Sequence, residues 1–300
     1  MNFLLTGSSG FIGTRLLNAI NDNLVLLSRN NNTSFPTIIC DFEKDEIPPD
    51  TFLSIDIVIH LAGISHDLGD ASKIEKLYHK VNVDASVKLA ALAAKNNVKR
   101  FIFISSVKAG GKPIPGRCRL EDEQDSPDGI YGITKREAEV AILEIGKISK
   151  MNVVVIRPSL VYGPNVKGNL NLMLKGIKSG WFPPLPETYN RRSMIHVDDL
   201  VRAIMLVSKD QRSNGKILIA TDGNLYSSRE IYETMCVLVN KSIPNWHVPK
   251  FMFNLLKFMS NRFKYKVDKL LGDECYESKG LDDLGFKPNK TLSEMNETSF

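Results

Sequence analysis

The sequence predicts an α/β protein built on a doubly wound parallel sheet, with a smaller, mostly helical C-terminal lobe. Three observations lead to this prediction. The chain opens with a buried strand and a glycine-rich turn, short apolar strands then alternate with helical patterns, and the pattern after residue 221 is mostly helical. Near-continuous apolar strands are typical of a parallel sheet that is covered on both faces.

The first element is a short apolar strand at residues 2–6, and a glycine-rich turn and an apolar helical pattern follow it. Glycine suits a tight turn, a close approach of backbone amides to a phosphate, and close packing of a helix on a strand. The helix N-terminus also offers free N–H groups and a partial positive charge to a pyrophosphate. We therefore expect a Rossmann-like dinucleotide site formed by Gly7, Gly10, Phe11, Ile12 and Gly13.

Five more strands are predicted along the chain, each short, apolar or β-branched, and bounded by turn residues. They span residues 24–28, 37–40, 56–60, 101–105 and 152–157, and a return strand follows at 216–220. We expect residues 1–165, with a return segment at about 193–221, to form a dinucleotide-binding domain. Residues 166–192 and 222–300 would then form the substrate-binding lobe.

Composition and charge limit the classes of function that we expect for the chain. The chain has 300 residues with 39 Lys and Arg against 34 Asp and Glu, a scattered excess that favours anionic small molecules over nucleic acid. Its four cysteines lie far apart, with no pattern typical of a metal site, so we expect reduced thiols and no metal. No secretory signal and no run approaching the ~20 residues of a membrane span is seen, so we expect a cytoplasmic protein without a span.

The second informative motif is Tyr131-Gly132-Ile133-Thr134-Lys135. Residues at i and i+4 share one helix face, and a neighbouring ammonium would lower the phenol pKa from about 10 toward the working range. Such a tyrosine can exchange a proton with a sugar hydroxyl while hydride moves to or from nicotinamide. Ser106 follows the strand at 101–105, at the carboxyl end where open α/β sheets bind ligands. Taken alone, the motif could also be a surface tyrosine beside a lysine.

Seven motifs in this order resemble the extended short-chain dehydrogenase/reductase family, in its nucleotide-sugar epimerase and reductase branch. They lie at residues 6–13, 60–63, 81–83, 103–106, 131–135, 157–164 and 191–199, and the resemblance covers about residues 2–205. The last third of the chain contains none of these motifs and resembles the family only in its mostly helical pattern.

The resemblance implies roles for individual residues. Tyr131 would be the catalytic acid/base, Lys135 would hold the cofactor ribose, and Ser106 would hydrogen-bond the reacting oxygen. Asn82 would brace the helix behind the site, and Asp199 an adjoining turn. The substrate contacts would be Ser106, Arg192 on the diphosphate and Asn169 on the uridine side. Arg191 would be a solvated neighbour of Arg192. The remaining cofactor contacts would come from Asp41, Phe42, Leu61, Ala62, Gly63 and Pro158.

Two departures from the family pattern are informative. Val107 and Lys108 stand where sugar 4,6-dehydratases of the family carry Asp-Glu, so we do not expect dehydration. Leu160 replaces an asparagine that many relatives carry, which removes one expected diphosphate contact.

The end of the second predicted strand bears on the cofactor. NAD enzymes of this fold generally carry Asp or Glu there, whereas this chain has Arg29. A guanidinium can pair with a 2′-phosphate, so we expect NADP, with NAD as the alternative. An exposed loop arginine with no ligand is the other interpretation.

The resulting expectation is an NAD(P)-dependent enzyme acting at the 4-position of a nucleotide-activated hexose. Arg29 favours reduction of a UDP-4-keto-6-deoxy-N-acetylhexosamine for surface-polysaccharide synthesis, and the alternative is an NAD-dependent UDP-hexose 4-epimerase. A non-catalytic NADP-sensing module is disfavoured because Ser106, Tyr131 and Lys135 are all present. The basic, apolar segment at 251–266 could lie on a membrane surface, but we expect it to pack in the core or in a homodimer contact.

Overall fold

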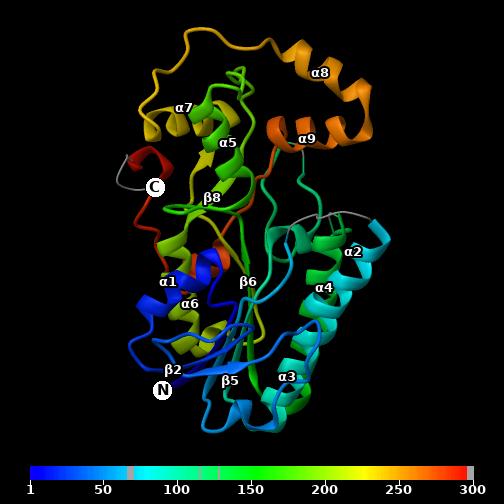
Figure 1. Ribbon diagram of the computed structural model, residues 1–300, viewed down its shortest axis with the longest axis vertical. Helices are drawn as coiled ribbons and strands as arrows, with labels where there is room; N and C mark the ends of the chain where they lie inside the picture. The colour runs from blue at the N-terminus through cyan, green and yellow to red at the C-terminus, as the bar shows by residue number, and fades with distance from the viewer. Residues whose placement is uncertain (66–70, 115, 128, 296–300) are drawn as a thin grey trace.

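The computed structural model describes residues 1–65, 71–114, 116–127 and 129–295. Its centre is a seven-stranded parallel sheet in the order β3-β2-β1-β4-β5-β6-β9 (Figure 1). The doubly wound parallel sheet is therefore confirmed, and each predicted strand is present with its ends shifted by at most one residue. The strands are β1 (Asn2–Thr6), β2 (Asn23–Ser28), β3 (Thr37–Ile39), β4 (Ile57–His60), β5 (Arg100–Ile104), β6 (Asn152–Pro158) and β9 (Ile217–Ala220).

Helices cover both faces of this sheet, as its apolar strands require (Figure 1). One face packs on α1 (Phe11–Ala19), α6 (Val197–Lys209) and α10 (Lys279–Asp283). The other packs on α3 (Ala85–Lys95) and α4 (Gly129–Ser149). Successive side chains of a strand point to opposite faces, so Phe3 and Leu5 enter the first core and Leu4 enters the second.

A second, three-stranded sheet lies outside the central one, and the sequence did not predict it. It consists of β10 (Leu225–Tyr226), β8 (Arg192–His196) and β7 (Leu160–Tyr162) in that order. β7 and β10 have only three and two residues, and β8 begins with Arg192 and Ser193, so none of them reads as a continuous apolar run. Their apolar side chains share a third core with α5 (Gly168–Ser179) and α7 (Ser228–Leu238).

The C-terminal third is mostly helical, as expected. After α7 it continues through α8 (Lys250–Met259) and α9 (Asn261–Leu271), which lie side by side at one end of the molecule (Figure 1). Core packing, expected for the segment 251–266, holds for Phe253 but not for most of α8, because Phe251, Leu255 and Phe258 are exposed. No described helix is both long and apolar enough to cross a bilayer. The remaining elements are α2 (Ala71–Tyr78), the π-helical turn η2 (His79–Asp84), and the 3-10 turns η1 (Pro49–Phe52), η3 (Val107–Gly110), η4 (Gln211–Ser213) and η5 (Leu292–Glu294).

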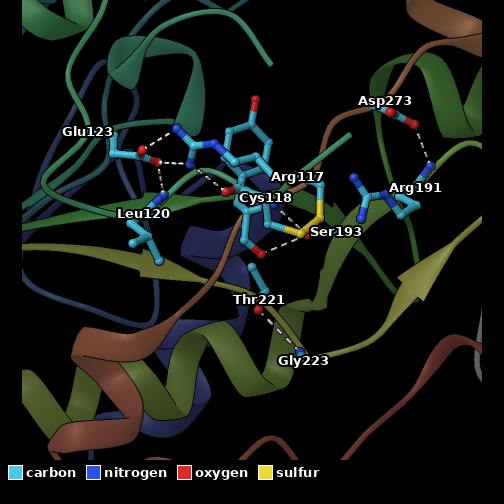
Figure 2. Close-up of a disulfide and its surroundings, with 11 residues drawn as sticks. Arg117, Cys118, Leu120, Glu123, Arg191, Ser193, Thr221, Gly223 and Asp273 are labelled. Atoms are coloured by element: carbon cyan, nitrogen blue, oxygen red, sulfur yellow. Dashed lines mark hydrogen bonds and ion pairs between the residues drawn. A yellow bond between two sulfur atoms is a disulfide. The ribbon is translucent and has the colours of Figure 1, made fainter. Parts of the chain in front are cut away.

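A disulfide joins Cys118 to Cys275, so the expectation of four free thiols is wrong for this pair (Figure 2). The two cysteines are 157 residues apart in sequence, but their Cα atoms are 4.4 Å apart. The reason is a local pairing of two loops, in which the Arg119 amide donates to the Cys275 carbonyl at 2.9 Å. Sequence spacing could not reveal this approach. Cys40 and Cys236 are buried free thiols.

Candidate active site

The turn between β1 and α1 has no room for side chains at its glycines. Gly7 has a φ of +73°, and a β-carbon there would lie 2.8 Å from the Ala62 amide nitrogen. A β-carbon on Gly13 would collide with the backbone of Gly7 and Ser8. Gly10 precedes α1 and supplies no side-chain cap, so the first amides of this helix have no side-chain acceptor there. Such free amides at a helix N-terminus fit a dinucleotide pyrophosphate.

The other predicted cofactor residues flank this turn along the carboxyl edge of the sheet. The loop that begins at Leu61 is tied to β1, because the Ala62 amide donates to the Thr6 hydroxyl at 3.1 Å. Phe42 packs edge-on against His60, with ring centroids 5.9 Å apart. Asp41 accepts a hydrogen bond from the Glu43 amide at 3.0 Å.

Two predicted cofactor residues lie at strand ends. Pro158 is the last residue of β6. Arg29 follows β2, is exposed, and makes no hydrogen bond or ion pair with another described residue.

Tyr131 reaches the site because of the glycine that follows it. A β-carbon on Gly132 would lie 2.6 Å from the Lys108 carbonyl oxygen, so only glycine lets α4 pack this closely on η3. Burial raises the pKa of the Tyr131 phenol to about 12, and the nearby Ser106 side chain acts in the opposite direction. The expected lowering of this pKa by Lys135 is not seen.

Lys135 is directed instead toward the sheet. Its Nζ donates to the Ile104 carbonyl at 2.9 Å and lies 4.5 Å from the centroid of the Phe103 ring. Burial lowers the pKa of Lys135 to about 8, while Glu139 opposes that shift. The ammonium therefore sits where the carboxyl end of β5 meets α4.

Asn82 braces the site as expected. Its side chain accepts from the Ile64 amide at 2.7 Å and donates to the Ile64 carbonyl at 3.0 Å. It also donates to the Thr134 hydroxyl at 3.3 Å. Asn82 thus ties the loop after β4 to the helix that carries Tyr131 and Lys135.

One cavity opens beside Tyr131, and a second cavity shares part of its lining. The smaller, about 300 Å³, is lined by Tyr131 and Ser65, and the larger, about 710 Å³, extends toward Lys112 and Asn190. Three side chains line both cavities, namely Lys108, Tyr265 and Lys269.

The larger cavity has a cationic wall. Lys108, Lys112 and Lys269 form no ion pair with other described residues, and burial and the charge of Lys108 both lower the pKa of Lys269. The carboxylates of this cavity have partners. Asp268 pairs with Lys257 at 2.7 Å, Glu274 pairs with Arg192 at 2.5 Å, and Asp273 accepts from the Arg191 amide at 2.8 Å. Unpaired ammonium groups suit a diphosphate.

Arg192 is not among the residues that line either cavity. Its guanidinium is buried, donates to the Lys269 carbonyl at 2.5 Å and pairs with Glu274, so its role as diphosphate ligand stays a prediction. Arg191 was expected to be solvated, but one of its guanidinium nitrogens is buried and has no hydrogen-bond partner in the described part of the chain. Asn169 is exposed on α5 and is not among the residues that line either cavity. Asp199 braces its turn, accepting from the Asn289 and Lys290 amides at 3.0 and 2.9 Å.

The cavity residues Tyr265 and Lys269 were not predicted from the sequence. The available signal was their i, i+4 spacing in a basic helix, the same spacing as Tyr131 and Lys135. In the sequence, Lys108 stands out only as a departure from the dehydratase pattern.

Known proteins share both the sequence pattern and the fold. A family model described as the NAD dependent epimerase/dehydratase family matches residues 3–220. The UDP-glucose 4-epimerase of Vibrio cholerae is 31% identical over 98% of this chain and 92% of that protein. An Escherichia coli O157:H7 protein named N-acetyl-alpha-D-glucosaminyl-diphospho-ditrans,octacis-undecaprenol 4-epimerase is 29% identical over the same shares, 98% and 92%.

Solved structures match over nearly the whole chain. UDP-glucuronic acid 4-epimerase from Bacillus cereus, in complex with NAD, has a TM-score of 0.79 at 20% identity and covers 99% of this chain and 96% of that one. MoeE5, in complex with UDP-glucose and NAD, has a TM-score of 0.78 at 22% identity, with coverages of 98% and 95%. These similarities establish the fold.

The chain belongs to the NAD dependent epimerase/dehydratase family. The resemblance to extended short-chain dehydrogenase/reductase enzymes is thereby confirmed, as is the expectation of an enzyme of this type.

Proposed function

We propose that the protein is an NAD-dependent 4-epimerase of a hexose that is carried on a diphosphate. The observation that carries this proposal is the position of Tyr131 on the wall of a cavity that is also lined by Lys108 and Lys269, which form no ion pair with other described residues. A sugar ring beside the tyrosine would place its diphosphate within reach of the two ammonium groups. Two relatives that match 98% of the chain, at 29% and 31% identity, are named 4-epimerases, which favours epimerisation over net reduction.

The chain's own residues would divide the chemistry as follows. When bound, NAD supplies a hydride acceptor that can return the hydride to the same carbon. Tyr131 would act in its phenolate form, taking the proton of the 4-hydroxyl as the C4–H bond breaks, and would return that proton to the oxygen after the 4-keto sugar has turned its other face. Ser106 hydrogen-bonds that oxygen. Lys135 would hold the cofactor ribose, and the amides at the start of α1 would bind the pyrophosphate.

Reduction of a 4-keto sugar by NADPH is the second candidate, because Arg29 is exposed at the end of β2 with no partner among the described residues. The two candidates differ in what they consume. An epimerase regenerates its cofactor at each turnover, whereas a reductase uses one equivalent of NADPH for each product.

The proposal is tested by incubating the purified protein with UDP-glucose or UDP-N-acetylglucosamine without added cofactor. We expect NMR to show the 4-epimer of at least one sugar at equilibrium, and the denatured protein to release NAD. Absence of inversion for both sugars, together with NADPH oxidation on addition of a UDP-4-keto-6-deoxyhexosamine, would establish the reductase instead.

A further inference from the structure

Helix α8 has two apolar faces, and the described residues cover only one of them. Phe253 points inward and is buried. On the outer face, five large apolar side chains are spaced at i, i+1, i+4, i+7 and i+8, a single stripe along the helix. They are Phe251, Met252, Leu255, Phe258 and Met259, and they are 48% to 88% exposed. Figure 1 shows α8 at the outer edge of the molecule, with α9 between it and the rest of the chain.

The α8–α9 hairpin, residues 250–271, also carries the positive charge of the protein. It contains six basic side chains and one acidic side chain, so its formal net charge equals the +5 of the whole chain. Asp268, its acidic residue, pairs with Lys257 across the two helices at 2.7 Å. Lys250, Lys264 and Lys266 are exposed. An exposed apolar stripe on a strongly basic helical pair is the pattern of a helix that lies on an anionic membrane surface.

The charge also argues against a second copy as the occupant of this surface. A two-fold contact would place the same patch on both subunits and bring two segments of net charge +5 together. Like charges at an interface are unfavourable, whereas anionic lipid headgroups complement them.

The hairpin is continuous with the catalytic cavity. Tyr265 and Lys269 of α9 line the same cavity as Tyr131, while the outer stripe belongs to the helix packed beside α9. We propose that the α8–α9 hairpin docks on an anionic bilayer and presents the cavity to a sugar whose diphosphate is attached to a membrane lipid. This proposal rests on the proposed function, since it names the carrier of the diphosphate for the same site.

Vesicle flotation tests the docking. Wild type is mixed with vesicles of phosphatidylcholine alone or of an equal mixture of phosphatidylcholine and phosphatidylglycerol. We expect binding to the mixed vesicles, a loss of at least about tenfold in Leu255→Ser/Phe258→Ser, and a loss of about fivefold for each lysine in Lys264→Gln/Lys266→Gln. Ile148→Ser is the matched control, because Ile148 is an equally exposed apolar residue on α4 and should bind like wild type.

Activity assays separate this proposal from the proposed function. Epimerisation of soluble UDP-N-acetylglucosamine should be unchanged in the hairpin variants. In the mixed vesicles, N-acetylglucosamine linked by diphosphate to a polyprenyl lipid should be epimerised by wild type, with a loss of at least about tenfold in Leu255→Ser/Phe258→Ser.

Each outcome is decisive. No binding to mixed vesicles, or binding that the hairpin variants do not alter, overturns the docking even if the soluble sugar is epimerised. A wild-type dimer that Leu255→Ser/Phe258→Ser converts to a monomer assigns the stripe to a second copy and also overturns it. Docking without epimerisation of either substrate overturns the proposed function alone, and docking with activity only on the soluble sugar overturns the lipid carrier.

Discussion

The β1–α1 end and the α8–α9 end of the molecule treat their apolar residues in opposite ways. In the first, Phe3, Leu5 and Leu16 are fully buried between sheet and helix. In the second, Phe258 is 88% exposed and Leu255 66% exposed. The first end is shaped by a cofactor fold that many sequences share, so its motifs are short and local. The α8–α9 end depends on what the individual protein binds. Its apolar pattern can therefore be interpreted only when the fold shows which of its side chains are exposed.

The largest effect is expected at Tyr131, which lies on α4 in the wall of the cavity that α9 also lines. Tyr131→Phe should lower turnover by about 10²–10⁴-fold, because it removes the proton-transfer group, while the affinity for NAD stays nearly unchanged. Steady-state kinetics and a nucleotide titration measure the two quantities. Tyr265→Phe is the control, since Tyr265 lines the same cavity from α9. Turnover of Tyr131→Phe close to that of wild type would mean that the cavity between Tyr131 and α9 is not the catalytic site.

Because Lys135 is buried, it makes the free energy of unfolding depend on pH. Burial lowers its pKa from 10.5 to about 8, so between these values the unfolded chain binds more protons than the folded one. Wild type should therefore gain stability relative to Lys135→Met as the pH rises through this window, by about 1.4 kcal/mol for each pH unit. Guanidinium unfolding of both proteins at about pH 7 and about pH 10 measures the difference. A difference that does not change with pH would contradict the buried ammonium.

Substitutions in the cavity wall show which side chains bind the diphosphate. Lys269→Met should raise the KM for a UDP-hexose by about tenfold to a hundredfold, since a charge-assisted contact contributes about 1.5–3 kcal/mol. Lys266→Met, on the exposed side of α9, is the matched control and should leave it unchanged. Calorimetry with free UDP checks the assignment. If Arg192→Ala weakens UDP and Lys269→Met does not, the contact belongs to β8.

The smallest effect is expected at Arg29. For an NAD-dependent epimerase, wild type should bind NAD at least as tightly as NADP. Arg29→Asp should lower the affinity for NADP by about tenfold and leave the affinity for NAD nearly unchanged. The effect is small because the exposed guanidinium stays partly solvated when it contacts a 2′-phosphate. Fluorescence titration of both nucleotides measures this. A strong wild-type preference for NADP would favour the reductase.

The sequence was informative where structure is local. The strand at 2–6 and the glycines after it predicted the β1–α1 turn, and the i, i+4 pair Tyr131 and Lys135 predicted one face of α4. It failed where contacts join distant segments. Nothing in the sequence pairs Cys118 with Cys275 across 157 residues. Likewise, the sharing of a cavity by Lys108 and Lys269 follows only from the placement of α9 beside η3.

The most direct test of 4-epimerisation follows the hydrogen at C4. UDP-glucose and UDP-N-acetylglucosamine, each deuterated at C4, are incubated with the protein in ordinary water, with NADPH present in excess, and the products are analysed by NMR and mass spectrometry. If Tyr131 serves a site that removes and returns the same hydride, the 4-epimer of at least one of the two sugars should form with the deuterium retained at C4. Deuterium lost from C4 of the product, or C4 hydrogen drawn from NADPH, would contradict epimerisation at this site.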